Sequence, residues 1–486
     1  MEEHWWVAVL PIILRSLALA AVALCICVLP WANVKLPGST HALIPWLACT
    51  AFVCWWLSRI LEWKSPRPHE KAVWWMTFLI TAYGWVVTCF PGAMVDRASG
   101  AILDLDKSPW LAFGTLDQEM SVQAMVFITS ALMLLVVALD FAFERTGRFV
   151  LALAVTFGGF VTAVAGLCLQ TSADLAALWE ISNIPNFVFG LFWYHGNTAA
   201  YLNLSWPVGL WLCLLLLHNG LRTFRQQMAL AFLVVAVMVQ IIAVFVVVSK
   251  VGHFLLIFEI VLLVVAGFVV WRPHFETLPF SKTRLALFAL IGVGLLVLGA
   301  WLSGAGAMLG RWNHFSQRHF DDPARRHATM MALQIGVDHA WTGTGPGTFE
   351  WVAAHYSPLD PILQGGRWRH AHNDYAEFFA EWGWPGAFFF VLLLAWPVRR
   401  VFNALRQAVF NSGRYRMSFE RRARLFCFST AIFSALLHAV VDFPLQIDAI
   451  RPLFAAMVGA VLAMTSSSAS QGARRDKQVP RESAGK

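Results

Sequence analysis

Two arginines and two histidines are gathered within six positions of the chain, at Arg367, Arg369, His370 and His372. The segment that contains them, "RWRHAHNDYAEFFAEWGWPG", predicts a short helix over 374–382, in which Asp374 and Glu377 resemble a capping pair and Gly383 is a stop signal. The amide donors and the dipole at the start of that helix favour an anion, and guanidinium groups add bidentate recognition. The ligand that these residues favour is a phosphate ester.

The histidines in this segment add acid–base chemistry to the anion site. Nearby cations and the helix N-terminus disfavour an imidazolium, so a histidine here is expected to be largely neutral near pH 7 and able to act as a general base. Two other interpretations stay open. His-x-His could begin a metal site, although the sequence supplies no strand with further ligands, or the Arg and His side chains could anchor the loop to lipid headgroups. We predict no metal and no cofactor.

A second pair of cations, Arg325 and Arg326, precedes this segment in "DDPARRHATMMALQIGVDHAW". The pattern predicts a helix over about 323–339 with Asp322 as its N-cap, so both arginines fall in the first turn. Cations there oppose the helix dipole unless an anion compensates them, either the preceding aspartates or a ligand. The next segment, "TGTGPGTF" at 342–349, predicts a tight structural turn rather than a nucleotide-binding loop.

The elements that must position these side chains are membrane helices. Of the 486 residues, 58% are hydrophobic and only 13% are charged, which is too apolar for a soluble domain. Runs long enough to cross a hydrocarbon core of ~30 Å recur along the chain. We predict an all-α, polytopic membrane protein with about twelve transmembrane helices, at 6–30, 41–62, 71–93, 122–143, 148–170, 198–218, 228–249, 251–271, 285–303, 384–402, 425–445 and 449–466.

The basic residues predict the orientation of this bundle. With the N-terminus and C-terminus in the cytoplasm, most Lys and Arg fall in cytoplasmic segments, so the formal net charge of +8 reflects topology and not nucleic-acid binding. The long polar segment at 304–384 and the smaller acidic loop at 94–121 then lie on the outer side of the membrane. The predicted organisation is helices one to nine in 1–303, a partly helical outer catalytic loop in 304–384, helices ten to twelve in 385–466, and a disordered cytoplasmic tail in 467–486.

The order of these motifs resembles the O-antigen ligase and polymerase superfamily of bacterial envelope glycosyltransferases. The resemblance rests on the arginine–helix–glycine turn segment, on "RHAHNDYAEFFAEWGWPGAF", on "WYHGNTAAYLNLSWP" at 193–207 and on "LLHAVVDFPL" at 436–445. There are departures. Lys250 stands where the family usually has an arginine, which keeps the charge but loses the planar fork, and it could equally be an interfacial lysine. His195 stands where an asparagine is common, whereas Asn197 matches.

The resemblance implies transfer of a glycan from a polyprenyl-diphosphate carrier to a hydroxyl acceptor, on the periplasmic face of the bacterial inner membrane. We predict His372 as the general base, oriented by Asn373 or Asp374. The diphosphate would be bound by Arg325 or Arg326, Arg367, Arg369 and Lys250. His370, His195 and Asn197 are predicted to line the site. His438 and Asp442 lie four apart on one predicted helix, and we interpret them first as a structural pair and second as site-lining residues.

The acceptor separates several possible functions. A lipid A-core sugar would make the protein a ligase, which is the interpretation that we favour, because the one large excursion comes late in the chain. A growing carrier-linked glycan would make it a polymerase, and a protein hydroxyl an O-oligosaccharyltransferase. A transporter of lipid-linked sugars is a different class, and the scarcity of charges within the predicted helices disfavours it. The expected partners are therefore membrane lipid, the lipid-linked donor and one of these acceptors.

Overall fold

The structure is a computed structural model of the whole chain, and it describes the parts of the chain that form its helices and their closest connections. The described residues are 5–33, 40–63, 68–96, 101–105, 114–171, 189–247, 249–268, 323–356, 368–410 and 417–476. The predicted span at 285–303, the proposed N-cap Asp322 and the predicted anion ligand Arg367 lie outside these residues.

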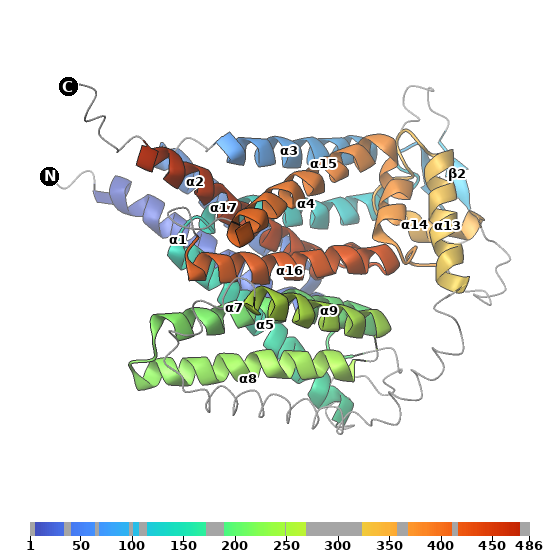
Figure 1. Cartoon of the computed structure of the whole chain (residues 1–486). Helices are drawn as coiled ribbons and strands as arrows, with labels where there is room; N and C mark the ends of the chain where they lie inside the picture. Colours follow the sequence, from blue (N-terminus) through green and yellow to red (C-terminus); the bar gives the residue numbers. More distant parts are fainter. Residues whose placement is uncertain are drawn as a thin grey trace, which may run out of the picture.

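Long helices that run side by side make up the body of the molecule, and shorter elements gather at one end of them (Figure 1). The helices on the N-terminal side are α1 (Trp5–Val28), α2 (Thr40–Leu61), α3 (Pro68–Cys89), α4 (Gln118–Phe141), α5 (Arg145–Thr171), α7 (His195–Asn219), α8 (Phe224–Val246) and α9 (Lys250–Ala266), with the short 3-10 helix η1 (Leu29–Asn33). The remaining elements are α13 (Pro323–Asp338), α14 (Phe349–Tyr356), α15 (Asp374–Phe410), α16 (Phe419–Val441), η5 (Pro444–Gln446) and α17 (Ile450–Asp476).

The apolar runs of the sequence become these long helices because only a helix satisfies its own backbone in hydrocarbon. Among the described residues, nine helices are long and apolar enough to cross a membrane, and each overlaps a predicted span. α9 and the apolar part of α17, Ile450–Thr465, are shorter and occupy two further predicted positions. The prediction of a helical, polytopic membrane protein is therefore confirmed, and the count of twelve stays a prediction.

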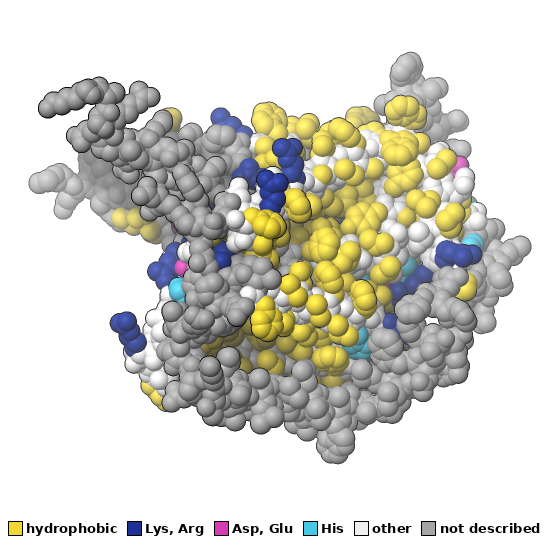
Figure 2. Space-filling view, viewed as in Figure 1, with side chains coloured by type: hydrophobic (Ala, Val, Ile, Leu, Met, Phe, Trp, Pro, Cys, Tyr) yellow, Lys and Arg dark blue, Asp and Glu magenta, His cyan; other side chains and the backbone are white. Residues whose placement is uncertain are grey.

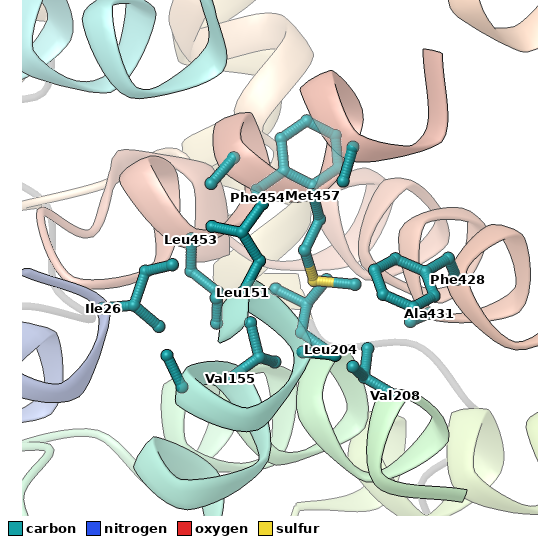
Figure 3. Close-up of a cluster of buried hydrophobic side chains, with 14 of the residues drawn as sticks. Ile26, Leu151, Val155, Leu204, Val208, Phe428, Ala431, Leu453, Phe454 and Met457 are labelled. Carbon is teal, nitrogen blue, oxygen red and sulfur yellow. The ribbon is translucent and has the colours of Figure 1, made fainter. Parts of the chain in front are cut away.

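The interior of the bundle is packed by side chains from helices that are far apart in the sequence. Figure 3 shows Ile26 of α1 and Leu151 of α5 in one cluster with Leu204 of α7, Phe428 of α16 and Met457 of α17. Between membrane helices such packing rests on van der Waals contact and close backbone approach, since lipid is as apolar as the core. Gly459 of α17 illustrates this, because a Cβ there would lie 2.3 Å from the Leu135 carbonyl oxygen of α4.

The outer surface has the polarity expected of a membrane protein. Figure 2 shows hydrophobic side chains gathered over the middle of α15 and α16, with the Lys and Arg side chains in view lying to either side of this band. Phe388 and Val391 of α15 are 60% and 59% exposed, which is unfavourable in water and expected against lipid. We therefore treat the long helices as membrane-spanning.

The stop predicted at Gly383 is confirmed, because its φ of 60° breaks α15 after the nine predicted residues, before a second helical part continues to Phe410. Two later helix ends differ from the predictions. α16 ends at Val441 rather than 445, because the residue before Pro444 disfavours helical geometry. α17 continues to Asp476, so residues 467–476 are helical where we expected a disordered tail.

The two loops that were predicted to lie on one side of the membrane meet in the structure. The Leu116 amide donates to the Thr344 carbonyl at 2.8 Å, and a small antiparallel hairpin of β1 (Ala93–Val95) and β2 (Ile102–Asp104) precedes this contact. The turn at 342–349 is structural, as predicted. Gly343, Gly345 and Gly347 all have positive φ, and a Cβ at Gly345 would lie 2.1 Å from Thr115 Oγ1.

Candidate active site

Helix α13 carries Arg325 to the end of the bundle, as the sequence predicted. Its buried face, formed by Ala328, Ala332 and Ile335, packs against α14 and the first part of α15. This packing leaves Arg325 in the first turn, where its guanidinium donates to the Val441 carbonyl at 3.2 Å and to the Tyr194 hydroxyl at 2.7 Å. Arg325 therefore ties α13 to the end of α16 and the start of α7.

The N-terminus of α15 positions His372 through an unusual backbone. Asn373 is the capping residue, since its Oδ1 accepts hydrogen bonds from the Tyr375 and Ala376 amides. His372, immediately before it, has φ of 52°, in the left-handed region that non-glycine residues rarely adopt. Among the described non-glycine residues, only Trp63 shares this feature. Strained residues of this kind cluster at functional sites, because the surrounding structure must hold them in place.

Asp442 is the residue on which the site converges. It is the C-cap of α16, with an extended backbone, so its side chain leaves the helix direction and turns towards α7 and α15. Gly196 at the start of α7 allows this approach, because a Cβ there would lie 2.9 Å from Asp442 Oδ2. The Asp442 side chain is only 2% exposed.

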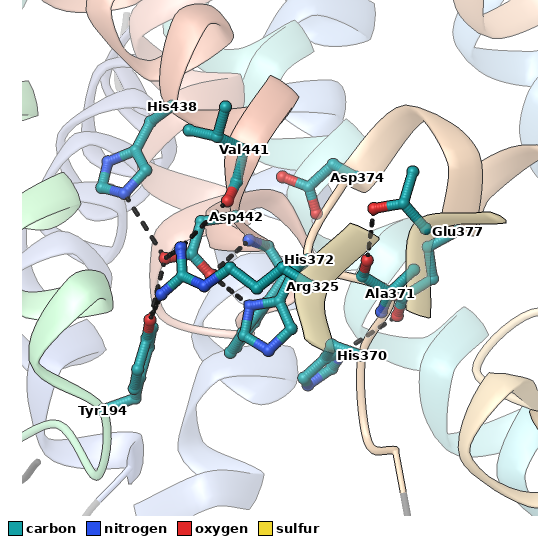
Figure 4. A network of polar contacts seen from close by, with 12 residues as sticks. Tyr194, Arg325, His370, Ala371, His372, Asp374, Glu377, His438, Val441 and Asp442 are labelled. Atoms are coloured by element: carbon teal, nitrogen blue, oxygen red, sulfur yellow. Dashed lines mark hydrogen bonds and ion pairs between the residues drawn. The ribbon is translucent and has the colours of Figure 1, made fainter. Parts of the chain in front are cut away.

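Four side chains from four elements contact the Asp442 carboxylate (Figure 4). His372 Nδ1 lies 3.1 Å from Oδ1, and the Tyr194 hydroxyl donates to Oδ2 at 3.1 Å. Arg325 Nη1 lies 3.7 Å from Oδ2, and His438 Nε2 lies 3.9 Å from it. Because a carboxylate only accepts, His372 Nδ1 is the protonated nitrogen in this contact, and its Nε2 is left as an acceptor.

The electrostatics of the site keep Asp442 ionised. Burial alone would raise the pKa of this carboxyl, but hydrogen bonding from His372 and His438 and the charge of Arg325 hold the pKa well below its usual range. The pKa of Tyr194 is raised, first by burial and then by the neighbouring Asp442 carboxylate. Tyr194 therefore acts as a neutral hydrogen-bond donor beside a fixed negative charge.

An aromatic ring, Phe443, organises the side chains around this carboxylate. Tyr194 stacks on it with ring centroids 5.2 Å apart, and His370 stacks on it at 4.3 Å. His372 meets the same ring edge-on at 4.9 Å. Phe443 thus holds both histidines of the His-x-His motif next to one surface.

The structure brings together some of the predicted site residues and separates others. Arg325, His370, His372, His438 and Asp442 belong to the cluster just described. Arg369 does not, because its side chain is 81% exposed and lies 3.9 Å from Glu350. The side chains of Arg326 and Lys250 are likewise exposed, in contrast to Arg325, although Lys250 begins α9, which packs against α7.

The two predicted residues at the start of α7 border the cluster. The His195 ring lies 4.6 Å from that of Tyr194. Asn197 is 5% exposed, and its Oδ1 has no hydrogen-bond partner in the part of the chain that the structure describes. Asn197 is therefore a buried polar group close to the site.

The residue that orients His372 was predicted incorrectly. Asp374 points away from the imidazole, since its Oδ2 accepts from the Leu445 amide at 2.8 Å, and Asn373 is occupied by capping. The partner is Asp442, seventy positions along the chain. The capping role proposed for Asp374 and Glu377 is also wrong, because Asn373 provides the cap and Glu377 accepts from the Ala371 amide at 2.6 Å.

Sequence reasoning missed Tyr194 and Phe443 and underrated Asp442. Both missed residues lie inside segments that resemble the family. Tyr194 precedes His195 and Phe443 follows Asp442, and only His195 and Asp442 were predicted to line the site. The structural-pair interpretation of Asp442 rested on a helix extending to 445, and the earlier end at Val441 turns its carboxylate into the site. Pro444 was the signal that could have shortened that helix.

No group of three or more His, Cys, Asp or Glu side chains with metal-binding geometry occurs among the described residues. Glu377 contacts His370, and Asp442 contacts His372 and His438.

These features define a class: an all-helical membrane protein with a His–Asp pair and an arginine gathered at one end of its bundle. Residues 241–391 match the family model described as O-Antigen ligase. The match confirms, over this segment, the resemblance seen in the sequence, and it supports membership in the O-antigen ligase superfamily. The matched segment contains Arg325 and His372, whereas Tyr194 and Asp442 lie outside it. No curated protein matches the chain.

Proposed function

We propose that this protein transfers a glycan from a polyprenyl diphosphate to a hydroxyl group at the outer face of the bacterial inner membrane, as an O-antigen ligase with lipid A-core as the acceptor. The observation that carries the proposal is the contact of His372 with Asp442 beside Arg325. A histidine held by a buried carboxylate is a general base, and an adjacent guanidinium is a phosphate ligand.

The chemistry follows from the nature of the donor. A glycosyl diphosphate already contains a good leaving group, so the protein must bind the diphosphate, position the acceptor and remove one proton. His372 Nε2 takes the proton of the acceptor hydroxyl while Asp442 stabilises the imidazolium that forms. The acceptor oxygen bonds to the anomeric carbon, and the bond to the diphosphate breaks. Direct displacement of this kind inverts the anomeric centre.

Arg325 is suited to the departing diphosphate. Its side chain is 31% exposed, so it can reach a ligand, and its contact with Asp442 is longer than a close ion pair. The Tyr194 hydroxyl and the Val441 carbonyl hold the guanidinium in place at the start of α13. We expect its solvent-exposed part to face the diphosphate. Lys250, at the start of α9, and Arg369 are the further cations that we expect to approach a bound donor.

The donor's hydrocarbon chain needs an apolar pocket next to this site. One such pocket lies between α3, α4, α15 and α17, lined mainly by aromatic and aliphatic side chains that include Phe378, Trp382 and Phe454. Asp374 and Leu445, each two positions after a residue that contacts the Asp442 carboxylate or stacks beside it, also line it. This continuity supports a lipid chain that runs from the cluster into the bundle, and it is how we propose that the carrier is held.

The decisive experiment is the substitution His372→Ala in the native host, with lipopolysaccharide and carrier-linked glycan analysed together. For a ligase we expect long carrier-linked polymer to accumulate and lipid A-core to stay uncapped. Accumulated single repeats would instead indicate a polymerase. His355→Ala is the matched control, because His355 is an exposed histidine on α14 whose ring hydrogen-bonds to the Trp351 carbonyl of the same helix. Normal glycans in a strain with normal levels of the His372→Ala protein would contradict the proposed role.

A further inference from the structure

His370 forms a second histidine–carboxylate pair next to the first. Its Nδ1 lies 2.9 Å from Glu377 Oε1, whereas His372 Nδ1 lies 3.1 Å from Asp442 Oδ1. The Glu377 side chain is 3% exposed, so this is a buried carboxylate, and the His370 side chain is 27% exposed. Figure 4 shows the two pairs side by side, with His370 held by α15 and His372 held by the end of α16.

Phe443 links the two imidazoles. His370 stacks on its face with ring planes 19° apart, whereas His372 meets it at 72°. The face of an aromatic ring attracts a cation, so the stacked geometry favours the charged form of His370. Because both rings contact one phenyl group, a ligand at His372 Nε2 is also within the neighbourhood of His370.

The charges around His370 favour an imidazolium. Burial opposes the charged form, but the Glu377 carboxylate, with Glu381 and Glu350 further away, more than offsets it, so the pKa of His370 is raised. The charged and titratable groups on the surrounding elements are Glu377, Glu381 and Asp374 on α15, Glu350 on α14, Arg369 next to it in the chain, Arg325 on α13, His372, His438 and Asp442 at the end of α16, and Arg451 on α17.

We propose that His370 is the second functional histidine of this site: an imidazolium, held by Glu377 and stacked on Phe443, that donates a hydrogen bond from Nε2 to the diphosphate leaving group while His372 receives the proton of the acceptor. This inference rests on the proposed function. It gives the two histidines of one motif opposite tasks, with one neutral at the start of the reaction and the other charged.

The step balances without any further reactant. The acceptor hydroxyl loses its proton to His372, and its oxygen forms the new glycosidic bond. The electron pair of the broken carbon–oxygen bond remains on the diphosphate, whose added negative charge is stabilised by the imidazolium of His370 and the guanidinium of Arg325. His370 keeps its proton throughout, and His372 returns its proton to water after the product leaves.

Glu377 is a positioning residue in this arrangement. While Oε1 holds the His370 ring, Oε2 accepts from the Ala371 amide at 2.6 Å, so one carboxylate fixes two consecutive residues. The residue that follows them is His372 with its left-handed backbone. Replacing Glu377 with Gln keeps an acceptor for the amide and removes the charge, which separates the two effects.

The test is binding of geranylgeranyl diphosphate to the full-length protein in nanodiscs between pH 5.5 and 9, with geranylgeraniol as the control for the chain alone. We expect binding to weaken as pH rises through the raised pKa of His370, because the cation is lost. His370→Gln should bind about tenfold to a hundredfold more weakly at low pH and lose this pH dependence. Glu377→Gln should retain binding at low pH and lose it at a lower pH than the unmodified protein.

The matched control is His355→Gln, which should reproduce the unmodified profile, including the part that comes from ionisation of the diphosphate itself. Identical profiles for His370→Gln and the unmodified protein would overturn the role of His370 and leave the proposed function standing. A protein that binds the alcohol as well as the diphosphate at every pH would contradict the proposed function. A transfer assay adds a check. Transfer by His370→Gln should be slower than by the unmodified protein, and the further substitution of His372 should abolish what remains.

Discussion

Two buried aspartates, Asp140 and Asp442, collect arginines from distant parts of the chain, and they do so in different ways. Asp140 of α4 lies 2.8 Å from Arg15 and 2.8 Å from Arg59, and the Trp55 indole also donates to it at 2.9 Å. Its donors are two permanent cations and an indole. Asp442 has one arginine, at 3.7 Å, and its closest partners are a histidine and a tyrosine.

We interpret the Asp140 network as structural and the Asp442 cluster as the proposed reaction site. Around Asp140 the charges are saturated, because Arg15 also binds Glu144 at 2.7 Å and Arg59 approaches Glu70 at 3.4 Å. A buried network of this kind is costly to break, because removing one partner leaves an uncompensated buried charge. Asp442 instead holds a histidine that can take up a proton and an arginine that is partly exposed to a ligand. Titratable and accessible partners, rather than buried charge itself, are therefore our reason for proposing the Asp442 cluster as the functional one.

The substitution Asp442→Asn should have the largest effect and would break the functional side of this comparison. An amide cannot hold the His372 tautomer in the same way, so the transfer rate should fall by about a thousandfold to ten-thousandfold, as for other His–Asp pairs. The measurement is glycan transfer by purified protein in proteoliposomes, with donor and acceptor saturating. A loss of less than about tenfold in a folded variant would show that Asp442 does not support the base.

The matching substitution at the other aspartate is Asp140→Asn, which should reduce stability and leave the transfer rate per folded molecule nearly unchanged. Leaving Arg15 and Arg59 without their buried partner should destabilise the protein by about 3–5 kcal/mol. Thermal unfolding and the yield of folded protein in detergent measure this. Glu144→Gln is the control, since its side chain is 51% exposed and screening should make its effect much smaller. A rate defect without loss of stability would reverse the two roles.

How far the sequence predicts this molecule depends on the distance over which residues interact. The membrane helices, the helix that begins at Pro323, the start of α15 at Asp374 and the turn at 342–349 follow from local patterns, and the structure bears them out. Arg325 and His372 could also be selected as candidates, because each occurs in a dense, local arrangement of charged or titratable residues. Local propensity and apolar length were sufficient for these predictions.

The partners of these residues could not be predicted in the same way. Arg325 contacts Tyr194 across 131 positions, and His372 contacts Asp442 across seventy. Such pairs depend on how helices from separate parts of the chain pack, which no single segment specifies. The choice between Arg325 and Arg326 shows the limit clearly, because the two are adjacent in sequence and only packing of α13 turns one inwards.

The smallest effect is expected from Tyr194→Phe, which sharpens the comparison by removing one hydroxyl from the functional cluster. The phenyl ring should keep its stacking on Phe443, but Arg325 loses an acceptor and Asp442 loses a donor. A hydrogen bond to a charged group contributes about 1.5–3 kcal/mol, and the exposed side of Arg325 can recover part of it from water, so the transfer rate should fall about tenfold.

Tyr356→Phe is the matched control for this prediction, because the Tyr356 hydroxyl also donates to an aspartate, Asp338, at 2.9 Å but lies on the exposed side of α14. Both variants remove a tyrosine–aspartate hydrogen bond, so equal losses of transfer would attribute the effect to general destabilisation. A tenfold loss confined to Tyr194→Phe, with similar thermal unfolding for the two proteins, would assign the hydroxyl to the functional cluster. It would also show that Arg325 needs its hydrogen bond to the Tyr194 hydroxyl in order to bind a ligand. The arginines around Asp140 have no such requirement, because we assign them a structural role.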